Sequence, residues 1–310
     1  MRTLADSRQA FAQLELRMHK HLSGVLNGGN AGLGLGPGSD PEEVVPYRPG
    51  EDDVRRIDWN VTARSAEPHV WRTRTENELE TWVLVDETAS MDFGTVEIEK
   101  GDLAAWVTGA VGLLSDGPGN RMGVLHLRAD GLRWTPAVAP RRAAYQALAA
   151  TREPSPPQQS EQTSLTRALM ALDQRHRRPG MRIVVSDFVE PDGAVERPFA
   201  WERALRRLSA RHDVVVVEVL DPRELALPDI GPVVLSDPET GNRREVWTSL
   251  PGLREEYAAL AAGHRAAVAA AVRAAGAGHV VLRTDRDWVG DLARFVRLRG
   301  SARPRRRSLR

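Results

Sequence analysis

Apolar and polar positions along this chain alternate in blocks that predict strands separated by helices. Short apolar runs typical of buried strands occupy residues 82–86, 121–128, 182–187, 213–220 and 279–283. Helical spacing of apolar residues covers 102–114, 141–151, 163–176, 199–211, 253–275 and 287–298. Asp130-Gly131 predicts a hairpin turn into a strand at 132–138, and residues 233–237 and 243–248 predict a second hairpin. This order indicates an α/β fold with a doubly wound, mostly parallel sheet.

The region before residue 79 has a different character. Apolar residues at helical spacing predict an amphipathic helix over the first 22 residues, followed by a glycine-rich loop at 27–38. Residues 70–80 predict an extended segment that leads into the central strand. We therefore divide the chain into an N-terminal region (1–78) that can add a small β element, an α/β domain (79–300) and a basic, disordered tail (301–310).

Composition excludes several classes of function. The 310 residues carry 43 Lys+Arg against 42 Asp+Glu, a net charge of +1 that gives no general attraction to nucleic acid. The arginine-rich tail lacks base-stacking aromatic residues, so nucleic-acid binding is not expected there. Without cysteine, thiol catalysis and zinc–thiolate sites are excluded. No apolar stretch approaches the roughly 18 residues of a membrane span, and the N-terminus lacks a signal-peptide pattern. A cytoplasmic protein without a membrane span is the expectation.

The candidate chemistry lies where predicted strands end. The apolar run Trp82 to Val85 ends at Asp86, and Thr88 and Ser90 follow at alternate positions. Another apolar strand ends at Asp187, and Thr163 begins a predicted helix after a long polar loop. Ligands bind at the carboxyl ends of strands in such sheets, and Mg²⁺ prefers hard oxygen ligands. These five residues therefore predict a site for Mg²⁺, or for Mn²⁺, with a position open to a carboxylate from a partner protein.

Other interpretations of this segment are weaker. A Walker B strand requires a phosphate-binding Gly-rich loop, which the sequence lacks. A phosphoaspartate hydrolase requires a second acid two residues after Asp86, where Thr88 stands. Each hydroxyl could also serve only as a helix cap. A metal-dependent phosphoester hydrolase using Asp86 stays open as the alternative function, as does a site that no longer binds metal.

Two motifs resemble a known family. Asp86-x-Thr88-x-Ser90, Thr163 and Asp187 resemble the metal-ion-dependent adhesion site (MIDAS) of von Willebrand factor A domains. The upstream segment from Tyr47 to Arg64 resembles the signature of the bacterial domain-of-unknown-function 58 family, whose members have a von Willebrand A-like fold. The sequence departs from the adhesion-site pattern by Thr88 in place of the commoner serine, and by Gln162 and Ser164 on either side of Thr163.

This resemblance implies a protein-interaction function. Members are often encoded beside MoxR-type AAA+ ATPases, which implies such an ATPase, or its client, as the partner here. A non-enzymatic, Mg²⁺-dependent adaptor in chaperone-like assembly or maturation is the resulting expectation. The segment from Tyr47 to Arg64 is interpreted as a loop anchored by Trp59 that braces the sheet, with a direct binding role as the alternative.

Overall fold

A computed structural model describes residues 4–26, 43–47, 54, 57–65, 67–72, 79–149, 164–190, 193–236 and 243–302. Its main sheet contains strands β3 (Glu80–Glu87), β4 (Arg121–Arg128), β5 (Gly131–Val138), β6 (Met181–Ser186), β7 (Asp213–Leu220) and β10 (Gly278–Arg283). The longer helices are α1 (Leu4–Leu26), α3 (Lys100–Leu114), α4 (Pro140–Ala149), α5 (Leu165–Arg175), α6 (Glu202–Ser209), α8 (Pro251–Ala274) and α9 (Trp288–Ala302). These bounds lie within a few residues of those predicted from the sequence pattern.

The main sheet is doubly wound. Its strand order is β10-β7-β6-β3-β4-β5, and every neighbouring pair is parallel except the hairpin β4–β5. The chain builds outward from β3 through β4 to β5, then returns to the other side of β3 with β6. The switch point therefore lies between β3 and β6, where ligands bind in open sheets of this kind. The predicted fold class is confirmed.

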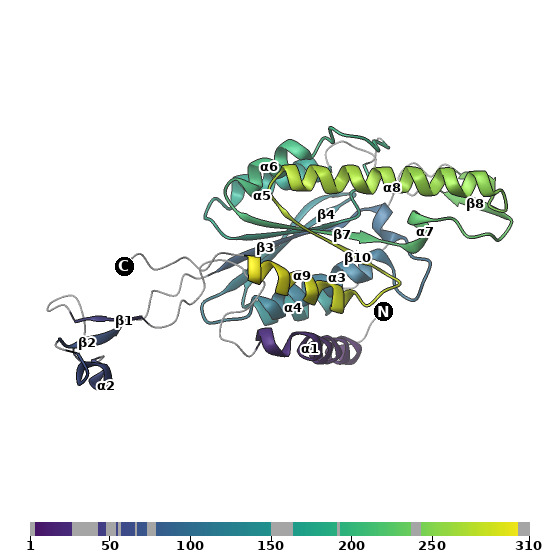
Figure 1. Ribbon diagram of the computed structural model, residues 1–310. Coiled ribbons are helices and arrows are strands. Elements are labelled where there is room, and N and C mark those ends of the chain that lie inside the picture. Colours follow the sequence, from purple (N-terminus) through teal and green to yellow (C-terminus); the bar gives the residue numbers. More distant parts are fainter. Residues whose placement is uncertain are drawn as a thin grey trace.

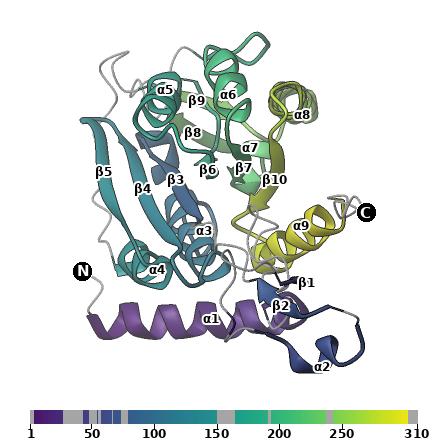
Figure 2. The same ribbon diagram turned by 90° about the vertical axis from the view of Figure 1, so that its left-hand side faces the viewer.

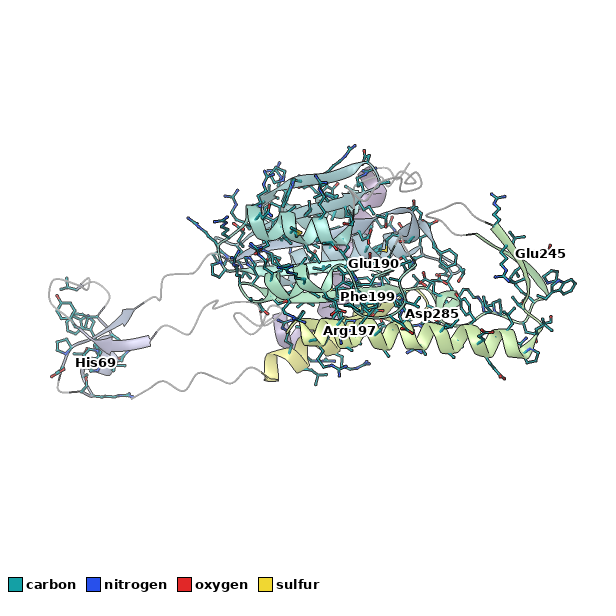
Figure 3. All side chains as sticks on the ribbon, turned by 90° about the horizontal axis from the view of Figure 1, so that it is seen from above. His69, Glu190, Arg197, Phe199, Glu245 and Asp285 are labelled. Atoms are coloured by element: carbon teal, nitrogen blue, oxygen red, sulfur yellow. The ribbon has the colours of Figure 1, made fainter. Side chains whose placement is uncertain are left out.

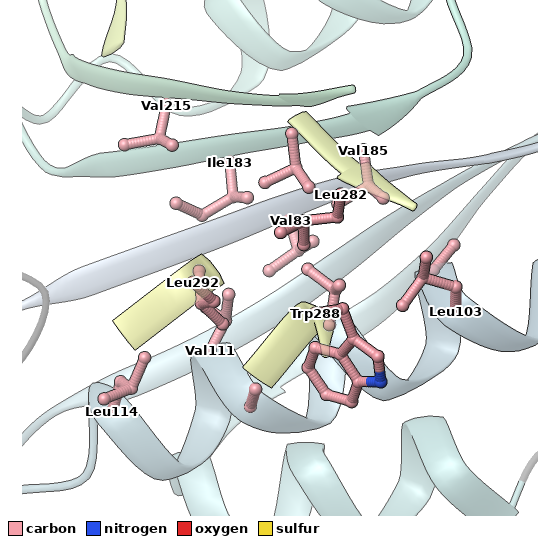
Figure 4. Close-up of a cluster of buried hydrophobic side chains, with 14 of the residues drawn as sticks. Val83, Leu103, Val111, Leu114, Ile183, Val185, Val215, Leu282, Trp288 and Leu292 are labelled. Carbon is pink, nitrogen blue, oxygen red and sulfur yellow. The ribbon is translucent and has the colours of Figure 1, made fainter. Parts of the chain in front are cut away.

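Helices cover both faces of the sheet (Figures 1 and 2). Alternate residues of each strand point to opposite faces, and the two hydrophobic cores follow this alternation: Val83 and Val85 of β3 belong to one core, Trp82 and Leu84 to the other. The first core contains residues of α1, α3, α4 and α9. Figure 4 shows part of it, with Val83 and Ile183 of the sheet near Val111 of α3 and Leu292 of α9. The second core contains residues of α5, α6 and α8.

Helix α1 packs on the main domain although it belongs to the N-terminal region. Leu14 and Met18 are fully buried in the first core. Arg17 forms an ion pair with Asp287 just before α9, with a nitrogen–oxygen distance of 3.3 Å. The predicted amphipathic helix thus uses its apolar face within its own chain.

A second group of short elements follows α1. Strand β1 (Glu43–Pro46) pairs with β2 (His69–Arg72), and the short helix α2 (Trp59–Thr62) lies between them in sequence. Asp58 caps α2 by accepting hydrogen bonds from the backbone of Asn60 and Val61 at 2.8 and 3.2 Å. Trp59 itself is 71% exposed. The interpretation of Trp59 as an anchor is therefore wrong, because helix α2 turns the indole to solvent.

The second predicted hairpin is also present. Strands β8 (Pro232–Ser236) and β9 (Arg243–Trp247) pair antiparallel, and α7 (Pro222–Leu225) connects the end of β7 to this region. Figure 3 shows Glu245 on the hairpin at the end of the molecule where α8 begins. None of the helices in the described ranges combines the length and apolar character that crossing a membrane requires.

Candidate metal centre at the switch point

The end of β3 positions Asp86 and two hydroxyl groups. Asp86 is buried, and its Oδ1 accepts hydrogen bonds from the Thr88 backbone at 3.1 Å and from Thr88 Oγ1 at 2.7 Å. Thr88 Oγ1 lies 3.3 Å from Ser90 Oγ in the 3₁₀ turn η2 (Ala89–Asp92). Thr88 precedes this turn but its side chain makes no capping hydrogen bond to it. Its hydroxyl is turned toward Asp86 and Ser90, so these oxygens form one cluster.

The neighbouring strand β6 brings a second carboxylate to the same place. Ser186, its last residue, donates from Oγ to Asp86 Oδ2 at 2.7 Å, which ties the two strand ends together. Asp187 follows directly and is fully buried. Its Oδ1 accepts a hydrogen bond from the Val189 backbone at 3.1 Å, and a hydrogen bond from Ser90 also reaches its side chain. The two carboxylates therefore share one buried centre.

A left-handed residue shapes the turn after β6. Phe188 has a φ of 58°, a conformation that costs a residue with a Cβ about 1–2 kcal/mol. Its ring is buried, 5.0 Å from the Trp201 ring in an edge-on arrangement, and its backbone nitrogen donates to Ser186 Oγ at 3.0 Å. Packing and this hydrogen bond hold the strained turn beside Asp187, whose carboxylate contacts Lys100 and Ser90.

A lysine enters the centre from α3. Lys100, the first residue of that helix, is 1% exposed, and its Nζ donates to Asp187 Oδ2 at 2.7 Å. The same ammonium contacts the Glu224 carboxylate of α7. Glu224 Oε2 also accepts from the Asp221 backbone at 2.9 Å, closing a capping box at the start of α7. The lysine thus connects the centre to the segment that follows β7.

Helix α8 supports the turn from the other side. Arg265 donates from Nη1 to the backbone oxygen of Asp187 and to Glu218 Oε1, both at 2.8 Å. Glu218, buried on β7, is also 2.8 Å from His279 Nε2 on β10. Since Glu218 is paired within this group, its charge is compensated locally and does not add to that of the candidate centre.

The two aspartates titrate differently. Burial, followed by the charge of Asp187, raises the pKa of Asp86 to about 6, against its hydrogen bonds to Thr88 and Ser186. Burial would raise the pKa of Asp187 too, but the Lys100 ammonium outweighs it and lowers that pKa. Asp86, Asp187 and the partly exposed Glu224 against the single Lys100 give this group a formal charge of −2, and burial also raises the pKa of Glu224. Such an uncompensated charge is costly away from water.

The donor atoms fit a hard divalent ion. Asp86, Thr88, Ser90 and Asp187, four of the five predicted ligands, are brought together, while Thr163 lies outside the described residues. Carboxylate and hydroxyl oxygens are ligands that Mg²⁺ accepts, with waters completing its octahedron, and the net negative charge of the surrounding group favours a cation. Within the described ranges, no group of three His, Asp or Glu side chains is arranged so that these residues alone could hold a metal ion. The candidate centre therefore depends on its hydroxyl groups.

Sequence reasoning missed Lys100, Glu224 and Phe188. Glu224 had a recognisable signal, because Asp221-Pro-Arg-Glu224 after a strand is a capping-box pattern that predicts a short helix. Lys100 and Phe188 had no specific sequence signal. A lysine before an apolar helix is common, and a phenylalanine does not indicate a positive φ.

The structure thus combines a doubly wound, mostly parallel sheet with carboxylate and hydroxyl side chains at its switch point. A model of the family described as "Protein of unknown function DUF58" matches residues 43–267, and the chain belongs to this family. An uncharacterized protein of Mycobacterium tuberculosis is 44% identical over 287 residues, which cover 93% of this chain and 88% of that protein.

Two solved structures are similar at lower identity. BatB from Bacteroides thetaiotaomicron is 15% identical with a TM-score of 0.42, covering 72% of this chain and 100% of that one. A von Willebrand factor type A protein from Catenulispora acidiphila is 14% identical with a TM-score of 0.36, covering 73% of this chain and 43% of that one.

Proposed function

We propose that this protein is a non-enzymatic interaction module that binds a partner through Mg²⁺, with Mn²⁺ as a substitute. The ligands would be Asp86, Thr88, Ser90 and Asp187, with Thr163 as a fifth. The observation that carries the proposal is the convergence of two carboxylates and two hydroxyls, from β3, η2 and the end of β6, in one buried cluster.

The bound ion would supply a positive charge with a coordination position open to a carboxylate of the partner. The chain's own residues hold and orient this place. Ser186 joins the two strand ends through Asp86, and the Phe188 turn and Arg265 fix the backbone of Asp187. This rigid framework favours docking, since little conformational entropy remains to be lost when a partner binds.

The partner in this proposal is a MoxR-type AAA+ ATPase of the same cell, or a client protein that such an ATPase assembles or matures. Family resemblance supports this choice, and the open position suits an acidic side chain on either protein.

Metal binding is tested by thermal unfolding with and without Mg²⁺ or Mn²⁺. A ligand at 100 times its Kd that binds only the folded state adds about 2.7 kcal/mol. For a domain of this size we expect the melting temperature to rise by about 5–10 °C. Asp86→Asn should abolish the rise. The matched control is Asp173→Asn, which changes another buried aspartate, paired with Arg207 and Arg211 on α6 and just after it, and should keep the rise.

The interaction is tested by measuring binding of the purified ATPase to immobilised wild-type and variant protein. Chelation alone is a poor test because an AAA+ ATPase itself requires Mg²⁺ with its nucleotide. Asp86→Asn should abolish binding while Asp173→Asn retains it. Equal binding by both variants would contradict a metal-mediated interface. Hydrolysis of a generic phosphoester that disappears in Asp86→Asn would instead favour a hydrolase.

A further inference from the structure

Lys100 stands where local preferences disfavour a lysine. A helix carries partial positive charge at its N-terminus, so a cation in the first turn is destabilised there. Lys100 occupies this position in α3 and is also 1% exposed, although burial disfavours an ammonium ion. A residue that violates local preferences usually serves a particular site. The neighbours that compensate Lys100 are Asp187 and Glu224.

The lysine and the candidate metal site share one carboxylate. Asp187 Oδ2 is 2.7 Å from Lys100 Nζ. The same side chain receives a hydrogen bond from Ser90, which belongs to the hydroxyl cluster beside Asp86. A divalent ion at that cluster would therefore lie close to an ammonium ion that is already bound to one of its ligands, and like charges at short range repel strongly in a buried place.

Glu224 is the second carboxylate that contacts the ammonium ion. It lies on α7, its carboxylate contacts Lys100, and its second oxygen is fixed by the Asp221 backbone at 2.9 Å. Asp221 is itself anchored, because it accepts hydrogen bonds from Thr95 Oγ1 at 2.6 Å and from Thr284 Oγ1 at 3.2 Å. Glu224 thus attracts Lys100 from a position that hydrogen bonds to Asp221 hold in place.

We propose that Lys100 is an internal cation of this centre that competes with the divalent ion for Asp187, and that Glu224 and Lys100 together set the affinity for metal. This inference rests on the proposed metal site. Removing the ammonium leaves three carboxylates without a cation and favours a divalent ion. Removing the charge of Glu224 makes the surroundings less negative and leaves Asp187 as the carboxylate that pairs with Lys100. Both effects disfavour binding of a divalent ion.

The test is calorimetric titration of the full chain with Mn²⁺, which reports binding without any activity assay. Lys100→Met keeps the length of the side chain and removes its charge, and should lower the Kd for Mn²⁺ at least tenfold. Glu224→Gln should raise the Kd at least threefold. Opposite shifts from two residues that contact each other distinguish this role from a merely structural one, which would weaken binding in both variants.

The outcomes separate this inference from the proposed function. Binding by the wild type with equal affinity in both variants, or weaker binding in Lys100→Met, overturns the role of Lys100 and leaves the metal site standing. Binding only in Lys100→Met supports the competition but overturns Mg²⁺ dependence of the native protein. Absence of binding in every form overturns both proposals. If Lys100→Met does not fold, as judged by circular dichroism, Lys100→Gln replaces it with the same expected direction.

Discussion

The turn at Phe188 allows backbone strain at the candidate centre to be measured directly. Among the described residues, Phe188 is the residue other than glycine with a positive φ. Replacing it by alanine or by glycine removes the same buried ring, and the two variants differ in a single methyl group. The difference in their free energies of unfolding therefore reports on the backbone conformation rather than on the lost packing.

The magnitudes follow from the burial and the dihedral angle. Phe188 is 1% exposed, so truncation to alanine should cost about 3–5 kcal/mol. Alanine keeps the strain of about 1–2 kcal/mol that a Cβ brings at this φ, and glycine relieves it. Glycine also gains about 0.4–1 kcal/mol of entropy in the unfolded state, which opposes that relief. The net expectation is that Phe188→Gly is more stable than Phe188→Ala by about 0.5–1 kcal/mol.

Urea denaturation followed by circular dichroism measures both variants. Phe199 provides the matched control, because it is also buried and stacks on Trp201 with centroids 5.2 Å apart, but has no positive φ. There the order should reverse, with glycine less stable than alanine by about 0.5–1 kcal/mol. If the alanine variant were the more stable one at Phe188 as well, the strain in the turn beside Asp187 would be refuted.

Two further predictions concern groups outside the centre. Burial, followed by the charge of Arg182, lowers the pKa of His212 from 6.5 to about 4, so only the unfolded state takes up its proton between these values. The contribution of His212 to stability is complete above pH 6.5 and falls by up to about 3 kcal/mol toward pH 4. Urea denaturation at several pH values in this range measures the free energy of unfolding, and its dependence on pH should be weaker in His212→Leu. The same pH dependence in the wild type and the variant would contradict this prediction. Gly123→Ala places a methyl group against the Trp82 ring and should lower the free energy of unfolding by about 1–3 kcal/mol. Gly263→Ala lies in open space on α8 and should raise it by up to about 1 kcal/mol. Destabilisation of equal size at both positions would refute the packing argument.

The fold could be predicted because its determinants are local in sequence. Apolar runs such as Trp82 to Val85 mark buried strands, and the helices between them require parallel connections. Parallel strands place their carboxyl ends at one edge, so Asp86 and Asp187 were expected to meet although they are 101 positions apart. The hairpins were predicted from the turn residues between their strands, and the long helix α8 from its alanine-rich sequence.

The remainder depends on contacts that no local pattern encodes. Lys100 meets Asp187 and Glu224 across 87 and 124 positions, and only the folded sheet brings them together. The φ of Phe188 is imposed by its packing on Trp201 and its bond to Ser186 rather than by its own preference. The prediction that Trp59 is an anchor was wrong because tryptophan is usually well buried, whereas the position of Trp59 in a one-turn helix exposes its side chain.

The pairing of α1 with α9 has a consequence during synthesis. Arg17 of α1 reaches Asp287, and its guanidinium lies 5.7 Å from the Trp288 ring at the start of α9. Residue 26 leaves the ribosome 262 residues before residue 288, an interval of roughly 15–50 s at ordinary elongation rates. Of the three helices that make the main contacts with α1 among the described residues, α3 and α4 emerge during that time and α9 follows. Final burial of the first helix therefore waits until α9 has been synthesised.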